Sequence, residues 1–121
     1  MKVGIVDYGV GNLGSVVKAL DQLGAKAALV TEPARLPDYE ALLLPGVGNF
    51  GDCARLLAAG GWPQALHEQV AAGRPLLGIC VGMQLLADTS SEHRLTAGLG
   101  LIPGAVVPLR EAKWHIGWNS I

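Results

Sequence analysis

The chain has 121 residues, enough for one compact domain, and 50% of them are hydrophobic. Only 16% are charged, the net charge is −1, and the basic residues are scattered singly, which argues against a nucleic-acid surface. No apolar run approaches the length of a membrane helix, and the start of the chain turns acidic at Asp7, too soon for a signal peptide. We therefore expect a reduced, cytoplasmic protein with free thiols at Cys53 and Cys80.

The apolar pattern predicts four short buried strands, with helices between or after them. A glycine-rich turn is expected at residues 8–12, and a loop from Thr31 to Asp38, which contains two prolines. After the last helix we expect a polar loop at residues 89–95 and then strand and turn pieces. The predicted strands are 3–6, 27–30, 41–44 and 75–79; the predicted helices are 13–23, 50–59, 62–72 and 81–87; the late pieces are 99–103 and 105–109.

This order of elements predicts an α/β fold with an open, mostly parallel sheet flanked by helices, as in flavodoxin-like proteins. In such sheets, ligands bind beyond the carboxyl ends of the strands. Three glycine-bearing turns are expected there, at residues 7–12, 45–49 and 80–84. The sequence therefore predicts that one edge of the sheet carries the chemistry.

The strongest chemical signal is Cys80, where the last predicted strand turns sharply into a helix. Gly78 and Gly82 flank it in a Gly-x-Cys-x-Gly pattern, which has the form of a nucleophile elbow with cysteine in place of serine. The unpaired N–H groups of the helix start favour negative charge, so we expect Cys80 to act as a thiolate nucleophile. Cys53, inside a predicted helix, is expected to be a small packing residue.

A second turn, Pro45–Phe50, contains two glycines that let its backbone approach a ligand. An acyl-transfer site needs a pair of N–H groups aimed at a developing oxyanion. The N–H groups of Val81 and of Val47 or Gly48 are the candidates. The alternative reading of residues 9–14, which spell Gly-x-Gly-x-x-Gly, is a dinucleotide site, but the expected acidic residue is at best Glu32 and that motif is weak alone.

A thiol nucleophile that makes and breaks acyl bonds needs a general base. His67, His93 and His115 are the available histidines, and none is followed by a carboxylate at a suggestive spacing. We expect His67 to face solvent on its helix, and we expect each of the three to be a surface or packing residue.

Together these residues resemble the class I glutamine amidotransferase family. Within it, they are most similar to the glutaminase subunits of imidazole glycerol phosphate synthases, which act in histidine biosynthesis. Four segments carry the resemblance: Asp7–Asn12, Leu44–Gly51, Gly78–Leu86 and His115–Asn119. Of these, Leu44–Gly51 and Gly78–Leu86 mark the broad family, and His115–Asn119 is typical of these subunits.

The resemblance implies a glutaminase without a cofactor or metal. Cys80 attacks the side-chain amide of glutamine, backbone N–H groups of Val81 and of the turn at Val47 and Gly48 hold the oxyanion, and Gly48 and Gln84 help hold the glutamine. The glutamyl thioester is then hydrolysed. The ammonia passes to a cyclase subunit, a (β/α)₈ barrel that forms imidazole glycerol phosphate and AICAR. The implied partners are this cyclase, in a heterodimer, and L-glutamine, with no nucleic acid and no membrane.

The resemblance also implies that Asn12, His115 and Trp118 lie toward the cyclase. Family members usually carry proline before this histidine, where this chain has Trp114 and so lacks the restriction that proline imposes. The family's catalytic histidine and glutamate match no position here. We therefore expect residues 1–121 to be the N-terminal part of a single domain, and this chain alone to be inactive. The alternatives are a non-catalytic docking module and another flavodoxin-like cysteine hydrolase.

Overall fold

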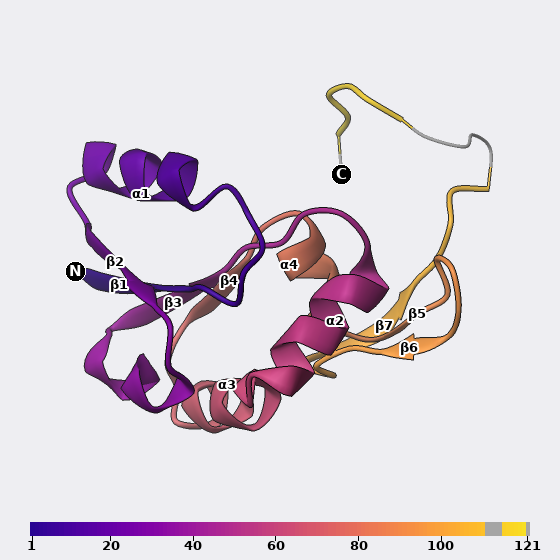
Figure 1. Ribbon diagram of the computed structural model, residues 1–121. Coiled ribbons are helices and arrows are strands. Elements are labelled where there is room, and N and C mark those ends of the chain that lie inside the picture. Colours follow the sequence, from indigo (N-terminus) through magenta and orange to yellow (C-terminus); the bar gives the residue numbers. More distant parts are fainter. Residues whose placement is uncertain (111–114, 121) are drawn as a thin grey trace.

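A four-stranded parallel sheet forms the centre of the molecule, with its strands in the order β2–β1–β3–β4 (Figure 1). The computed structural model describes residues 1–110 and 115–120. The parallel pairing confirms the open sheet expected from the sequence. Within the described residues, none of the helices has the length and apolar character that a membrane span requires. The strands are β1 (Lys2–Val6), β2 (Lys26–Val30), β3 (Ala41–Leu44) and β4 (Leu76–Gly78).

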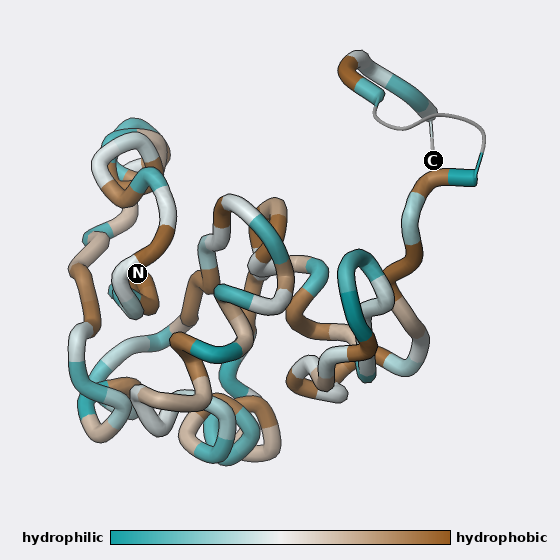
Figure 2. Tube along the Cα trace, turned by 45° about the vertical axis from the view of Figure 1, so that its right-hand side comes forward, coloured by the Kyte–Doolittle hydropathy of each residue, from teal (hydrophilic) through white to brown (hydrophobic). Residues whose placement is uncertain are grey.

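Helices cover both faces of this sheet: α1 (Leu13–Gln22) lies on one, and α2 (Phe50–Ala59) and α3 (Trp62–Ala71) lie on the other (Figure 1). Alternating strand residues divide between two apolar clusters, because successive side chains of a strand point to opposite faces. Ile5 packs under α1, whereas Val6 packs against the residues of α2 and α3. In Figure 2, hydrophilic and hydrophobic residues alternate along the helices, as amphipathic packing on a sheet requires.

The segment expected to be a loop from Thr31 to Asp38 is instead largely a 3₁₀ helix, η1 (Pro33–Asp38). Proline suits the first turn of a helix, and the buried Leu36 anchors this turn to the core. Arg74 lies in the connection between α3 and β4. Its Nε donates a hydrogen bond of 2.6 Å to the Tyr39 carbonyl, which holds the end of η1. The loop prediction was wrong because the polar composition and the two prolines favour a loop, whereas the single buried Leu36 anchors a helical turn.

The predicted helix over residues 81–87 is also wrong in length. The helix α4 spans only Val81–Gln84, and the chain then enters a strand, β5 (Ala87–Ser90). The Leu85 carbonyl accepts from Leu99 N–H at 2.7 Å, so the returning chain takes the acceptors that a longer helix would need. The same strand occupies the start of the loop expected at residues 89–95.

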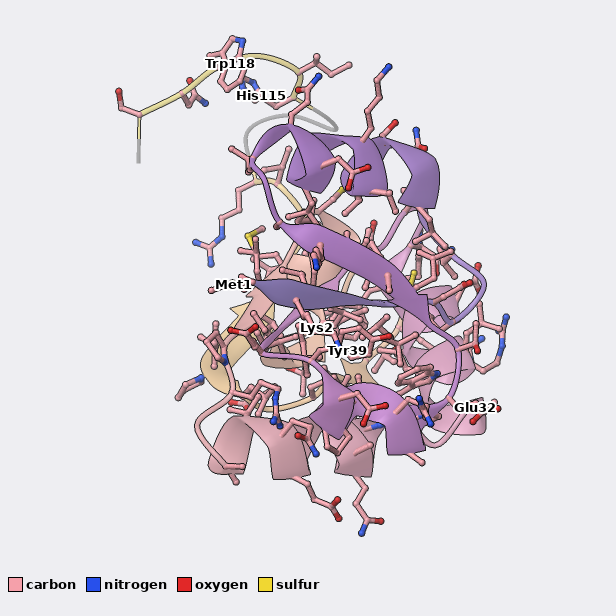
Figure 3. All side chains as sticks on the ribbon, turned by 90° about the vertical axis from the view of Figure 1, so that its left-hand side faces the viewer. Met1, Lys2, Glu32, Tyr39, His115 and Trp118 are labelled. Atoms are coloured by element: carbon pink, nitrogen blue, oxygen red, sulfur yellow. The ribbon has the colours of Figure 1, made fainter. Side chains whose placement is uncertain are left out.

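The strand β5 is the middle strand of a small second sheet, which has the order β6–β5–β7. Its other strands are β6 (Thr96–Ala97) and β7 (Ile102–Val106), so the late apolar pieces expected at 99–103 and 105–109 supply one strand across their junction. Beyond this sheet, residues 115–120 lie apart from the strands and, in Figure 1, well away from α1; Figure 3 labels His115 and Trp118 on this segment. Trp114, which replaces the usual proline, is outside the described residues.

Candidate functional site

The turns that follow β1, β3 and β4 meet at the carboxyl edge of the parallel sheet. The Tyr8 hydroxyl donates a hydrogen bond of 2.6 Å to the Pro45 carbonyl and so joins the first two turns. A Cβ placed on Gly46 would lie 2.6 Å from the Gly82 backbone nitrogen, which brings the second turn against the start of α4. A Cβ on Gly82 would in turn collide with the Leu44 carbonyl. Glycine at both positions is therefore required by the close approach.

Cys80 occupies the sharp turn between β4 and α4, with φ 57° and ψ −123°. It is the only non-glycine residue with a positive φ in the part of the chain that the structure describes. Such a backbone conformation is strained for a residue with a Cβ and tends to occur at functional sites. The side chain is exposed. The geometry is that of a nucleophile elbow, as the Gly-x-Cys-x-Gly pattern predicts.

Backbone donors without protein partners occur directly after this cysteine and on the turn after β3. Among residues 1–110 and 115–120, the N–H groups of Val47, Gly48 and Val81 donate to no protein acceptor. The next N–H groups of α4 are occupied, since that of Gly82 bonds the Ile79 carbonyl at 2.9 Å. Free donors on two adjacent turns are what an oxyanion needs.

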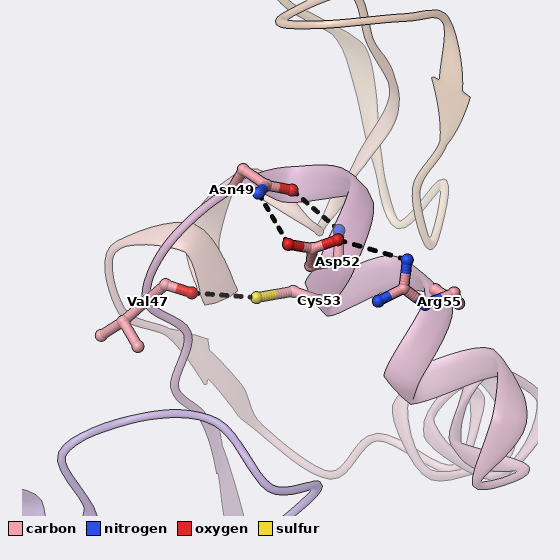
Figure 4. Close-up of polar contacts among 5 residues, drawn as sticks. All are labelled: Val47, Asn49, Asp52, Cys53 and Arg55. Atoms are coloured by element: carbon pink, nitrogen blue, oxygen red, sulfur yellow. Dashed lines mark hydrogen bonds and ion pairs between the residues drawn. The ribbon is translucent and has the colours of Figure 1, made fainter.

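The turn after β3 is held in place by the first turn of α2 (Figure 4). Asn49 caps the helix, because its Oδ1 accepts from the Asp52 N–H at 2.8 Å. The Asn49 amide also donates to the Asp52 carboxylate at 2.8 Å, and Arg55 pairs with that carboxylate at 3.2 Å. The Cys53 Sγ lies 3.2 Å from the Val47 carbonyl oxygen. These contacts make the end of this turn and the start of α2 one unit.

Tyr8 lies beneath the site as a neutral donor. Burial first, and then hydrogen bonding and electrostatic interaction with Cys53, raise the pKa of its phenol well above the ordinary value. Its hydroxyl therefore keeps its proton for the Pro45 carbonyl across the ordinary pH range.

The remaining residues that the sequence singles out lie in three places. Gln84 is half-buried at the end of α4, on the same short helix that Cys80 precedes. Asn12 caps α1 at the same edge of the sheet, where its Oδ1 accepts from the Ser15 N–H at 3.3 Å. His115 and Trp118 are exposed on the separate segment, which Figure 1 shows well away from α1. The structure thus brings Gln84 to the cysteine and leaves His115 and Trp118 apart from the sheet.

No histidine or carboxylate hydrogen-bonds the Cys80 thiol among the residues that the structure describes. His67 is exposed, which confirms the expectation for that residue. His93 is exposed on the turn between β5 and β6, and His115 contacts Asn119, with 3.1 Å between its Nε2 and the amide nitrogen. Within the described ranges no three acidic, histidine or cysteine side chains are grouped as metal ligands.

A cavity of about 390 Å³ lies between the start of α2 and the turn that joins β5 to β6. The Glu92 carboxylate reaches across it to within 3.5 Å of the Phe50 N–H. The cavity is open and mixed in character, with Asn49, Arg55 and Thr96 also on its walls. It places a polar hollow next to the turn that carries the free N–H groups.

Sequence reasoning missed Tyr8 and Glu92 and treated Cys53 as packing alone. Cys53 is buried, as expected, but its thiol also makes a directed contact with Val47. The one available signal was its position four residues after the cap Asn49. Side chains in a helix point toward the helix N-terminus, so a residue in this position points toward the preceding loop. The contacts of Tyr8 and Glu92 span 37 and 42 residues of sequence, so no local pattern reveals them.

The sequence matches the family model described as "Glutamine amidotransferase class-I" over residues 4–120. It is 47% identical to "Imidazole glycerol phosphate synthase subunit HisH" of Wolinella succinogenes, over 97% of this chain and 60% of that protein. It is 42% identical to the protein of the same name from Bacillus subtilis, over 98% of this chain and 60% of that protein. The chain thus spans about 60% of the length of these curated relatives.

Two further similarities bear on subunit organisation and fold. The chain is 43% identical to "Imidazole glycerol phosphate synthase hisHF" of Emericella nidulans, of which it covers only 22%. A solved structure, "Crystal structure of glutamine amidotransferase", superposes with a TM-score of 0.75 at 26% identity, over 88% of this chain and 56% of that one. A peptidase E protein from Listeria monocytogenes shares the fold alone, at 17% identity and a TM-score of 0.69.

Proposed function

The chain belongs to the class I glutamine amidotransferase family, and from this premise we propose that it is the glutaminase subunit of an imidazole glycerol phosphate synthase. Its reaction is the hydrolysis of glutamine to glutamate, with the ammonia delivered to a cyclase subunit for histidine biosynthesis. The observation that carries the proposal is the strained, exposed Cys80, with φ 57°, beside unbonded N–H groups of two turns.

The chemistry begins with attack of the Cys80 thiolate on the carboxamide carbon of glutamine. The amide oxygen becomes an oxyanion, which accepts hydrogen bonds from the Val81 N–H and from the turn at Val47 and Gly48. The carbon–nitrogen bond then breaks, and the nitrogen leaves with an added proton as ammonia. Water hydrolyses the resulting glutamyl thioester and returns the thiol. We assign Gln84 the role of holding the glutamine, which its place on α4 supports.

The proposed partner is a cyclase subunit built as a (β/α)₈ barrel. The relatives are named as subunits, and the fused Emericella nidulans protein carries the combined name hisHF, which supports a heterodimer. Asn12 lies at the carboxyl edge of the sheet, and His115 and Trp118 are exposed on their own segment. We assign these three residues to the cyclase interface. No cofactor enters the proposed reaction.

The general base is the remaining component. Coverage of about 60% of the relatives supports the proposal that residues 1–121 are the N-terminal part of one amidotransferase domain. The base is then expected in the part of the relatives that this chain does not match. A docking module without catalysis is the competing function, favoured by the lack of a described base on Cys80.

The test uses the native protein, expressed from its complete gene together with the cyclase of the same genome. Purified complex is incubated with glutamine, and glutamate is measured. Glutamate release that disappears in Cys80→Ala supports the glutaminase. A complex that forms stably but releases no glutamate supports the docking module, and turnover that survives Cys80→Ala contradicts the proposed mechanism.

A further inference from the structure

Cys53 is a buried thiol that the proposed reaction does not use. It lies in the first turn of α2 with 1% of its surface exposed. Its Sγ is 3.2 Å from the Val47 carbonyl oxygen, a contact drawn in Figure 4. Its own N–H is occupied by the Asn49 carbonyl at 3.3 Å, so the backbone that carries the thiol is fixed by the helix. A weak S–H donor is thus aimed from a rigid element at one peptide of the turn after β3.

That contact determines where the Gly48 N–H points. In a trans peptide the N–H and the C=O point in opposite directions. The Val47 carbonyl is directed inward at a buried thiol, so the N–H of the same peptide, which belongs to Gly48, is directed outward. Val47 is exposed, and a Cβ placed on Gly48 would meet nothing within 4 Å. The Gly48 N–H is therefore directed away from the core, on the turn whose Gly46 lies against the start of α4.

Little else holds this peptide. Gly48 has φ 87°, and glycine permits a wide range of rotation. Among the described residues no backbone N–H bonds the Val47 carbonyl. At the other end of the turn, Tyr8 holds the Pro45 carbonyl, but that bond does not constrain the peptide at Gly48. Without the thiol, the Val47 carbonyl is free to turn toward water and take the Gly48 N–H with it.

We propose that Cys53 is a positioning residue for glutamine hydrolysis, which orients the Gly48 N–H toward the substrate oxyanion by binding the Val47 carbonyl. The inference rests on the proposed function. The side-chain requirement is a hydrogen-bond donor of small size at position 53. Serine satisfies it, and alanine does not. Since an oxyanion contact strengthens in the transition state, its loss should reduce kcat more than it raises KM.

The experiment compares Cys53→Ala and Cys53→Ser in the native complex. Leu57→Val is the matched control, because Leu57 is equally buried, one turn further along α2, and its truncation disturbs packing without touching Val47. We expect Cys53→Ala to lower kcat about tenfold, with KM for glutamine changed less than about twofold. Cys53→Ser should restore most of kcat. Leu57→Val should keep kcat even where its thermal midpoint falls as far as that of Cys53→Ala.

Equal kcat values in Cys53→Ala and the unmodified complex, or equal losses in the alanine and serine variants, would overturn the inference while leaving the glutaminase intact. Absence of Cys80-dependent glutamate release in the unmodified complex would instead contradict the proposed function. In that case the amide NMR signal of Gly48 decides. It should shift in Cys53→Ala and return toward its original position in Cys53→Ser, and an unchanged signal in Cys53→Ala refutes the positioning role.

Discussion

The Tyr8 hydroxyl binds the Pro45 carbonyl at 2.6 Å and thereby ties the turn after β1 to the turn after β3. Both turns belong to the carboxyl edge of the sheet, where the third turn carries Cys80. The bond is buried, so it links two loops of the candidate site from beneath and leaves their upper surface open. The site is therefore a set of loops held by core contacts, as is common in open parallel sheets.

Tyr8→Phe should lower the free energy of unfolding by about 1 kcal/mol at neutral pH, because a buried carbonyl loses its donor. The pH dependence gives a second signature. The pKa of the Tyr8 phenol is raised in the folded state, so its contribution is fully present below the unfolded pKa of about 10 and is lost as the pH rises further. Denaturant titrations across pH 9 to 11 should show a steeper loss above about pH 10 in the unmodified protein than in Tyr8→Phe. Parallel profiles would contradict this.

Gly46→Ala should disturb the meeting of the second and third turns. Its added Cβ would lie 2.6 Å from the Gly82 nitrogen, so the backbone must move, at a cost of about 1–3 kcal/mol. Gly14→Ala is the matched control, because a Cβ there meets nothing within 4 Å and the residue lies inside α1. The control should be neutral or slightly stabilising. Thermal unfolding of both variants checks the contrast, and similar midpoints would disprove the close approach.

Trp118→Ala should weaken cyclase binding about tenfold without changing the thermal midpoint, since exposed aromatic residues often dominate interfaces. The Trp118 side chain is fully exposed, at 102% of its reference area. Leu23→Ala is the control, because Leu23 is also an exposed apolar residue, at 81%. It lies at the C-terminal end of α1, whereas Asn12, a proposed interface residue, caps the N-terminal end. Isothermal titration with the cyclase measures both. Unchanged affinity in Trp118→Ala would remove this residue from the proposed interface.

Local signals predicted the central fold because its elements depend on local patterns. The strand 41–44 and the helix 50–59 have the predicted bounds, since an apolar run and a capped amphipathic stretch each specify one structure. The helix at 81–87 was wrong because residues 99–102, distant in sequence, take its carbonyl acceptors. A local pattern contains no information about such pairing.

The same difference between local patterns and contacts distant in sequence applies to the residues of the candidate site. Cys80 was visible because the elbow is a local pattern of strand, glycines and helix. Tyr8 was not visible, because its role depends on a partner in another turn. For Cys53, burial was predictable from an apolar helix face, whereas the direction of its thiol toward Val47 depends on the path of the loop before α2. The elbow at Cys80 is thus easier to predict from sequence than the residues that support the turns beside it.

We propose that Cys80 is the nucleophile that attacks glutamine. The most direct test of this proposal is covalent labelling of the native complex with a diazoketone analogue of glutamine, followed by peptide mass spectrometry. We expect one adduct, on Cys80, whose formation is slowed by added glutamine and is absent in Cys80→Ala. Cys53, which is 1% exposed, serves as the internal control and should stay unlabelled. Labelling of Cys80 that glutamine does not slow, or equal labelling of both cysteines, would contradict the account.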